Sequence, residues 1–188
     1  DDGSYDLRVV TTDDAGNTTT SASRTVVVDN HAPAGSLTQP ADGADLRGSV
    51  TVASSPADAG SGVTSVQFQV EAFRDTSFSD LGPAVTAGPY QTEWDTTAID
   101  DGLYELRVVT TDAAGNTTTS PRRTVRVDNT APSGAVTQPA DGAAVRARAT
   151  LVSDSADGGS GVASAQFQVK GPGDVSFSDL GPAETSAP

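Results

Sequence analysis

The chain has 188 residues and a formal net charge of -14, from 25 acidic against 11 basic side chains. This surplus of negative charge repels nucleic acid and anionic lipid, so we expect no nucleic-acid partner and no membrane insertion. The absence of cysteine excludes a disulfide framework and thiol chemistry, and no apolar run is long enough to span a bilayer.

The sequence repeats itself. Residues 1–89 align with residues 100–188 at a constant offset of 99, without insertion or deletion, and 59 of the 89 pairs are identical. A fixed period of this length indicates an array of one small domain. We therefore expect 1–31 to hold the C-terminal strands of one repeat, 32–130 to be a complete repeat, and 131–188 to be the N-terminal part of a following repeat.

Strand signals dominate the complete repeat. Apolar and polar residues alternate at 66–70 and at 104–108, the pattern of a half-buried strand, and turns rich in Asp, Gly and Pro separate such runs. In chain order we expect strands near 35–39, 48–54, 63–70, 73–79, 88–94, 102–110 and 117–128. Seven short strands without helical periodicity predict an all-β chain of tandem immunoglobulin-like antiparallel β-sandwiches.

Differences between the copies show which positions face solvent. Val27 is Arg126 in the next copy, while the valines on either side are retained, so we expect this position to point outward. Tyr104 follows Asp-Gly at the start of a strand, where it is either a tyrosine corner or an ordinary inward tyrosine. A lone Trp94 at an inward position favours the core over a carbohydrate-stacking platform.

Short linkers at 29–33 and 128–132 close one copy and open the next. Proline restricts the residue before it to extended backbone and stiffens the joint. We therefore expect neighbouring copies of the repeat to be each other's partners, joined head to tail as a rod.

Five segments carry a family resemblance: 63–70, 90–97, 101–108, 111–116 and 127–132 resemble the bacterial Ig-like repeats of large surface proteins and adhesins. The resemblance covers every residue of the repeat. It implies a bacterial extracellular location, secreted or on the cell surface. Repeats of this kind serve as stalks, spacers and filaments, and also as accessory modules of secreted enzymes, so the fold by itself does not settle the function.

Calcium is the one cofactor that the sequence suggests. Related adhesin repeats bind calcium at domain junctions, hard cations take six to eight oxygen ligands, and the turns and linkers place oxygen-bearing side chains near a junction. The candidate ligands are Asp13, Asn17, Asp29, Asp112, Asn116 and Asp128. The alternative, which we favour, is a hairpin turn that these residues stabilise without metal, and the change of Asp14 to Ala113 shows that one ligand is dispensable.

No catalytic residue is expected. The segments 58–62 and 157–161 carry Asp and Ser, which suggest an acid pair or a nucleophile, but the sole histidine, His31, is Thr130 in the other copy. No second base accompanies either serine, so the roles that a catalytic site requires are not filled. We therefore expect no enzyme.

The repeat is out of phase with the chain, and methionine is absent, so we expect a fragment or a processed product. Two hypotheses follow. The chain is a window on a longer array, which we prefer, or the tail of one molecule is completed by the head of the next through β-augmentation.

We expect a structural repeat of an extracellular bacterial surface protein that forms a rod, stalk or filament for adhesion or display, with a cell-surface or glycan target. The alternative is a spacer or carbohydrate-binding accessory module of a secreted enzyme.

Overall fold

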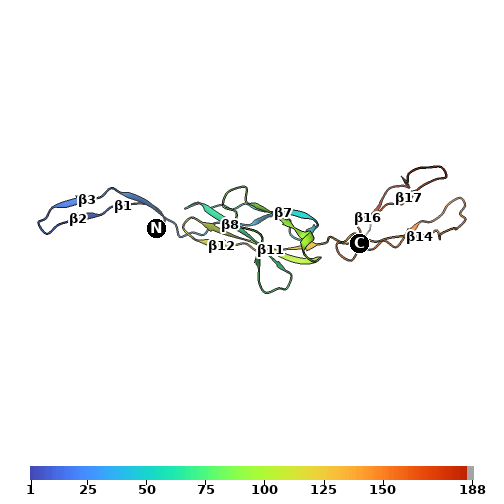
Figure 1. The fold of residues 1–188 in the computed structure, drawn as a ribbon, viewed down its shortest axis with the longest axis horizontal. Coiled ribbons are helices and arrows are strands. Elements are labelled where there is room, and N and C mark those ends of the chain that lie inside the picture. Colours follow the sequence, from blue (N-terminus) through green and yellow to red (C-terminus); the bar gives the residue numbers. More distant parts are fainter. Residues whose placement is uncertain (186–188) are drawn as a thin grey trace. The chain divides into compact units, whose positions relative to one another are not determined.

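The computed structural model describes residues 1–185 and divides the chain into two compact units, Asp1–Val127 and Asp128–Pro188 (Figure 1). Both units are built from β-strands paired in antiparallel ladders, as predicted, and the one parallel pair among the described strands joins β13 to β6. Among these residues, no helix has the length and apolar character needed to cross a membrane. The predicted boundaries at 31 and 130 remain a prediction.

Within the first unit, the complete repeat folds as a sandwich of two sheets. The smaller sheet has the strand order β10-β7-β5, and the larger has the order β6-β13-β11-β8-β9, with β12 paired to β11. The strands of the smaller sheet are β5 (Leu37–Gln39), β7 (Ser49–Ser54) and β10 (Gln91–Asp95). Those of the larger sheet are β6 (Asp45–Leu46), β8 (Val63–Ala72), β9 (Ser79–Asp80), β11 (Gly102–Asp112), β12 (Thr117–Thr119) and β13 (Arg123–Val127). A 3-10 turn, η1 (Thr96–Ala98), follows β10.

The core lies between these sheets because alternate side chains of each strand point inward. In the central ladder, Leu106 of β11 faces Val70 of β8 and Val108 faces Phe68. The buried apolar residues are Leu37, Val52, Val66, Phe68, Trp94, Leu106, Val108, Val125 and Val127. Trp94 therefore belongs to the core, as predicted, and not to a carbohydrate platform.

The tyrosine at the entry to β11 forms a tyrosine corner. The Tyr104 hydroxyl donates to the carbonyl of Asp100 at 2.8 Å, and the ring meets Trp94 edge to face with centroids 5.7 Å apart. Its counterpart Tyr5 donates to the carbonyl of Asp1 at 2.7 Å. Of the two possibilities that the sequence left open, the structure selects the corner in both copies.

Two predicted strands were wrong in extent. The range 73–79 is mostly a turn, because the Asp75 N–H donates to the Ala72 carbonyl at 2.9 Å and Arg74 takes a φ of 76°; only β9 is extended. The range 117–128 splits into β12 and β13. At the split, the Ser120 hydroxyl accepts from the Val108 N–H at 3.0 Å, and the following proline has no N–H to donate.

Residues 1–28 form a long hairpin built from β1 (Gly3–Leu7), β2 (Val10–Thr12), β3 (Thr18–Thr20) and β4 (Arg24–Val28). Its registers repeat those of β11 with β13 and β12: Gly3 faces Val28 as Gly102 faces Val127. Within residues 1–185 no second sheet packs against the hairpin, and Leu7 is 56% exposed whereas its counterpart Leu106 is 1% exposed.

The second unit repeats the pairings of the first half of a domain. Its strands are β14 (Val136–Gln138), β15 (Val152–Ser153), β16 (Ser164–Ala165), β17 (Gln168–Val169), β18 (Ser178–Asp179) and β19 (Glu184–Thr185). The β17–β18 pair has Gln168 opposite Asp179, as Gln69 lies opposite Asp80 in β8–β9. Local hairpins thus form in the partial copy without the ladder that joins β8 to β11.

Candidate functional site: the junction at the linker

Two consecutive linker residues, Asp29 and Asn30, form hydrogen bonds with different parts of the chain. The Asp29 carboxylate accepts from the Ser61 N–H at 2.7 Å and from the His31 N–H at 3.1 Å, which ties the linker to the complete domain. The Asn30 side chain donates to the Asp2 carboxylate at 2.6 Å, which ties the linker to the hairpin before it. The linker is therefore anchored on both sides.

The turn after β11 closes over the same linker. Asn116 donates its side-chain N–H groups to the carbonyl of Asp29 at 3.0 Å and to that of His31 at 3.3 Å. Its backbone and side chain also donate to the two Asp112 carboxylate oxygens, each at 2.8 Å. One asparagine thus stabilises its own turn and holds the linker backbone.

The loop before β8 completes the junction. The Asp58 carboxylate accepts from the N–H groups of Gly60 and Gly62 at 3.1 and 2.7 Å, so the loop curls around this side chain. The Ser61 hydroxyl accepts from the Ala114 N–H at 3.1 Å. Hydrogen bonds therefore join each of the three segments, the loop before β8, the turn after β11 and the linker, to the other two.

Three carboxylates converge where these segments meet. Asp29, Asp58 and Asp112 each offer an oxygen, and these atoms lie within 4.8 Å of one another. Asp29 and Asp112 are buried and Asp58 is half-buried. Within residues 1–185, no arginine or lysine forms an ion pair with any of the three. Hydrogen bonds to the Asp29 carboxylate, of which those from Ser61 have the largest effect, lower its pKa and favour its charged form.

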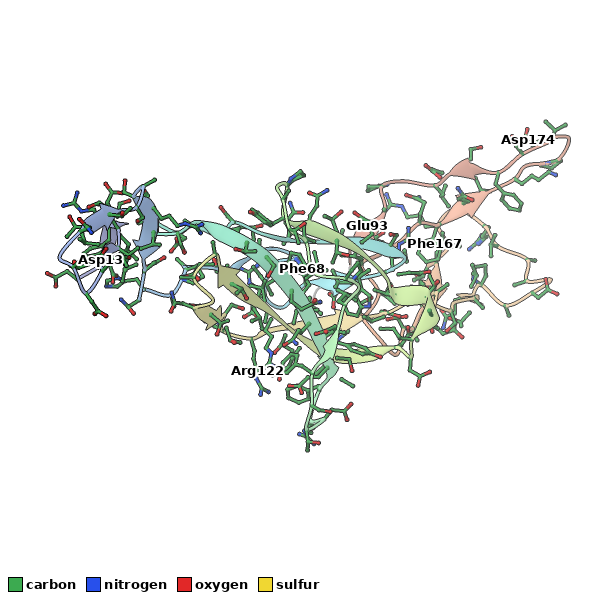
Figure 2. All side chains as sticks on the ribbon, turned by 60° about the vertical axis from the view of Figure 1, so that its left-hand side comes forward. Asp13, Phe68, Glu93, Arg122, Phe167 and Asp174 are labelled. Carbon is green, nitrogen blue, oxygen red and sulfur yellow. The ribbon has the colours of Figure 1, made fainter. Side chains whose placement is uncertain are left out.

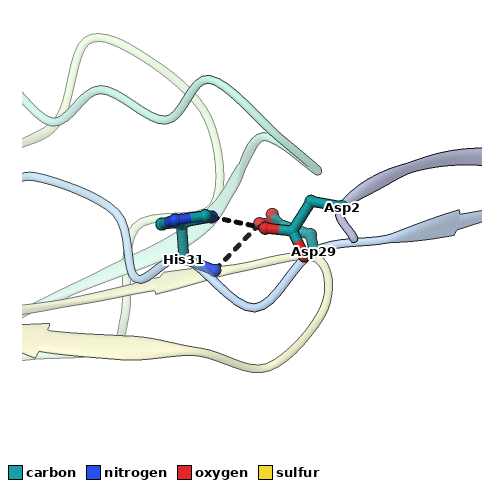
Figure 3. Close-up of side chains that lie close together, drawn as sticks. All are labelled: Asp2, Asp29 and His31. Carbon is teal, nitrogen blue, oxygen red and sulfur yellow. Dashed lines mark hydrogen bonds and ion pairs between the residues drawn. The ribbon is translucent and has the colours of Figure 1, made fainter.

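A second group shares Asp29 and lies on the hairpin side of the linker (Figure 3). It contains Asp2, Asp29 and His31, whose ligand atoms also lie within 4.8 Å of one another. His31 Nδ1 contacts the Asp2 carboxylate, and the pKa of Asp2 is lowered, above all by its hydrogen bond from Asn30. The linker aspartate thus stands between acidic groups of two successive repeats.

The structure brings together only some of the predicted ligands. Asp29, Asp112 and Asn116 meet at this junction, whereas Asp13 and Asn17 form the same turn at the exposed tip of the hairpin, with N–H to carboxylate distances of 2.7 and 2.8 Å. Asp128, in the second unit, accepts from the Ser160 N–H at 2.6 Å, which reproduces the contact between Asp29 and Ser61.

Two acidic residues of the junction were missed by the sequence analysis as ligands. Asp58 and Asp2 recur in the other copy as Asp157 and Asp101, so their retention was visible, but their distance along the chain from the linker hid their proximity. The hairpin-turn interpretation and the carboxylate cluster coexist, because Asp112 stabilises the turn and also faces Asp29 and Asp58.

A separate charged cluster covers the outer face of the larger sheet, near Arg122 in Figure 2. Arg122 pairs with Glu71 at 2.8 Å and with Glu105 at 2.6 Å. The guanidinium groups of Arg107 and Arg122 lie 3.8 and 5.0 Å from the Phe78 ring centroid. Burial and, to a smaller extent, the neighbouring Glu105 raise the pKa of Glu71, although the charge of Arg122 acts to lower it.

This raised pKa predicts a pH effect on stability. A carboxyl whose pKa is higher in the folded state contributes stability that is fully present below its unfolded value, here about 4.5, and that is lost as the pH rises through the folded value. Glu71→Gln removes that loss. We expect the stability of the variant relative to the parent to increase between pH 4 and pH 7, measured by urea unfolding with Trp94 fluorescence. An identical pH slope for the two proteins would contradict the prediction.

Family comparisons match three stretches of the chain. The family described as a bacterial Ig domain matches residues 33–108, the bacterial Ig-like domain of group 3 matches residues 88–164, and a further bacterial Ig-like domain family matches residues 1–30. Together these stretches cover residues 1–30 and 33–164. Among curated proteins, none matches the sequence.

Three solved structures are similar to parts of the chain. Fibronectin(III)-like modules of Clostridium thermocellum CbhA share 21% identity at a TM-score of 0.41, over 68% of this chain and 63% of theirs. An endo-beta-1,4-mannanase from Thermotoga petrophila shares 22% sequence identity at a TM-score of 0.41, and the match covers 54% of this chain and 21% of the mannanase chain. An engineered protein shares 24% sequence identity at a TM-score of 0.37, and the match covers 51% of this chain and 20% of the engineered chain. The chain thus spans less than two thirds of the length of each.

Proposed function

Because the chain belongs to the bacterial Ig-like domains, which are typically non-catalytic and usually occur in extracellular or surface proteins, we propose that it is a rigid structural segment of a bacterial surface protein. In this role it is not an enzyme. Copies joined head to tail form a rod, stalk or filament that displays an adhesive region away from the cell and towards a cell-surface or glycan target. The observation that carries the proposal is the anchoring of the linker on both sides, by Asp29 and by Asn30.

A linker held in this way has little freedom to bend. A free linker of a few residues acts as a hinge between domains, but here Asp29 and Asn116 fix the linker to the complete domain while Asn30 fixes it to the hairpin. Pro33 is fully buried and restricts the backbone further. These contacts favour a limited range of angles between successive repeats, which a spacer needs to keep its length.

The rigidity predicts a narrow distance distribution across the junction. The chain has no cysteine, so cysteines introduced at exposed Thr19 and Thr76 accept two spin labels without competition. Pulsed electron double resonance is expected to give one narrow distribution in the parent, and a broader one in Asn30→Ala, which frees the linker from Asp2. Asn17→Ala is the matched control at the hairpin tip and should leave the width unchanged. A distribution as broad in the parent as in Asn30→Ala would refute the rod.

Calcium is the second part of the proposal. Asp29, Asp58 and Asp112 supply hard oxygen donors of the kind that calcium prefers, their oxygens already lie within 4.8 Å of one another, and no basic side chain of residues 1–185 pairs with them. The residues therefore fit a divalent cation, and Asp2 adds a further carboxylate on the hairpin side. Bound calcium would offset the repulsion among these groups and add to the stiffness of the joint.

A ligand that binds only the native state raises its melting temperature. We expect calcium to raise the melting temperature of the complete domain, read by Trp94, and a chelator to reverse the change. Asp58→Asn should abolish this shift, whereas Asp157→Asn, the same change in the following copy, should retain it. If calcium does not shift the melting temperature of the parent, the calcium part of the proposal is wrong. The rigidity of the rod is tested separately by the spin-label experiment.

A further inference from the structure

The first linker carries a histidine that the following linker lacks. His31 is the only histidine of the chain, and the aligned residue of the next linker is Thr130. The Nδ1 atom of His31 contacts the Asp2 carboxylate, and Figure 3 shows the imidazole beside Asp2 and Asp29. One ligand atom from each of these three residues lies within 4.8 Å of the others. The group therefore offers one nitrogen and two oxygen donors, and not carboxylates alone.

This donor set suits a transition metal better than it suits calcium. Zinc binds imidazole nitrogen and carboxylate oxygen, and a zinc site with three protein ligands keeps a fourth position for water. Calcium and magnesium take oxygen ligands, so an imidazole contributes little to their binding. Two carboxylates also balance the charge of a divalent cation. A histidine beside two aspartates thus favours a cation of the zinc type.

Hydrogen bonds hold all three residues of the group in place. The Asn30 side chain donates to the Asp2 carboxylate at 2.6 Å, and the Asp29 carboxylate accepts from two backbone N–H groups. Asn116 donates to the carbonyl of His31 at 3.3 Å, which fixes the backbone that carries the imidazole. Outer contacts of this kind orient metal ligands and raise the affinity for the metal, because less freedom is lost on binding.

The group borders a cavity with room for an ion and its water. The cavity has a volume of about 590 Å³ and is lined by Asp2, Asp29, His31 and Asp58, with alanine and glycine as its remaining walls. No arginine or lysine within residues 1–185 lines it. The cavity thus offers a metal ion a place beside two carboxylates and the imidazole.

We propose that Asp2, Asp29 and His31 bind zinc or a similar divalent transition-metal ion. The site is distinct from the calcium site proposed above, which requires Asp58 and Asp112, although both use Asp29. A zinc ion at this position joins Asp2 of the hairpin to the linker that opens the complete domain. The effect of zinc on the joint rests on the proposed rod, whereas zinc binding itself does not.

Zinc binding is tested on the full chain by isothermal titration with zinc alone and by nuclear magnetic resonance of the imidazole. Because His31 is the only histidine, its ring signals report on this site without overlap. We expect one zinc ion to bind the parent and to shift these signals. His31→Thr, which installs the residue of the following linker, is expected to lose this binding step. Asn30→Ala keeps the three ligands but frees Asp2, so it is expected to weaken zinc binding about tenfold.

Control variants separate the site from unspecific attraction to an acidic chain and from the calcium site. Asp14→Ala removes one charge at the hairpin tip, where the following copy already carries Ala113, and should leave zinc binding unchanged. Asp58→Asn should retain zinc binding, and His31→Thr should retain any calcium-dependent shift in melting temperature. The fluorescence of Trp94 shows that each variant is folded.

Three results would overturn the zinc site, whether or not calcium binds. The first is a parent whose imidazole signals do not respond to zinc. The second is a zinc titration that is the same for the parent and for His31→Thr. The third is an equal loss of zinc affinity in Asp14→Ala and His31→Thr, which would show that net charge alone attracts the metal.

Discussion

Leu106→Ala is expected to lower the unfolding free energy of the complete domain by about 2 to 5 kcal/mol, whereas Leu7→Ala should leave it unchanged. Both leucines occupy the same position of the repeat and the same kind of strand. Leu106 is 1% exposed between two sheets and Leu7 is 56% exposed on the hairpin. Truncation at Leu106 therefore loses apolar burial and leaves a cavity, while truncation at Leu7 loses neither.

The measurement is urea unfolding followed by Trp94 fluorescence, because Trp94 lies in the same core as Leu106 and reports on the complete domain alone. A cost of Leu7→Ala equal to that of Leu106→Ala would show that Leu7 packs against the complete domain, which contradicts its exposure in the structure.

Gly60→Ala is expected to destabilise the complete domain by about 1 to 3 kcal/mol, the usual cost of overpacking. A Cβ at Gly60 would lie 2.4 Å from the Asp29 Cγ, a distance at which one group must move. Asp29 is a short side chain held by Ser61 and His31, so its displacement breaks the contact between linker and loop.

The control for backbone effects is Gly88→Ala, in the same domain, where the nearest atom to a Cβ is a Tyr90 ring carbon at 3.7 Å, an ordinary contact, and the following copy already carries Ala187. In a double-mutant cycle, Asp29→Ala should remove most of the cost of Gly60→Ala, since the clash is with that carboxylate. The thermal unfolding of the parent, the two single variants and the double variant is followed by Trp94 fluorescence. Additive costs in the cycle would contradict the steric explanation.

The strand positions of the complete domain could be predicted where apolar periodicity was strong. The run at 66–70 and the run at 104–108 became neighbouring strands with the expected faces inward, and Arg126 lies between two buried valines. The region 73–79 was predicted wrongly because its turn depends on the Arg74 conformation and on a backbone bond to Ala72. The complete copy carries no Gly or Pro at these positions, but the aligned residues 171–173 of the following copy are Gly, Pro and Gly, a turn signal that the prediction overlooked.

The candidate site was predicted in part. Asp29, Asp112 and Asn116 stood out because they lie in the short turn and linker motifs that both copies retain. Asp58 was considered only as a catalytic acid. It is 29 positions from Asp29 in the numbering, and only the folded loop brings its carboxylate within 4.8 Å of the other two. Ser61 was dismissed as a nucleophile, and its N–H and hydroxyl instead hold the linker and the turn.

By itself, the sequence determined the period, the fold class and the inward set of side chains, because these depend on local alternation and on the comparison of two copies. Only the tertiary structure decided which aspartates converge at the junction, and that Asp29 binds the complete domain while Asn30 binds the hairpin before it. These properties arise from contacts between residues far apart in the chain, and a carboxylate's neighbours in space are set by how the sheets pack and not by its spacing in the sequence.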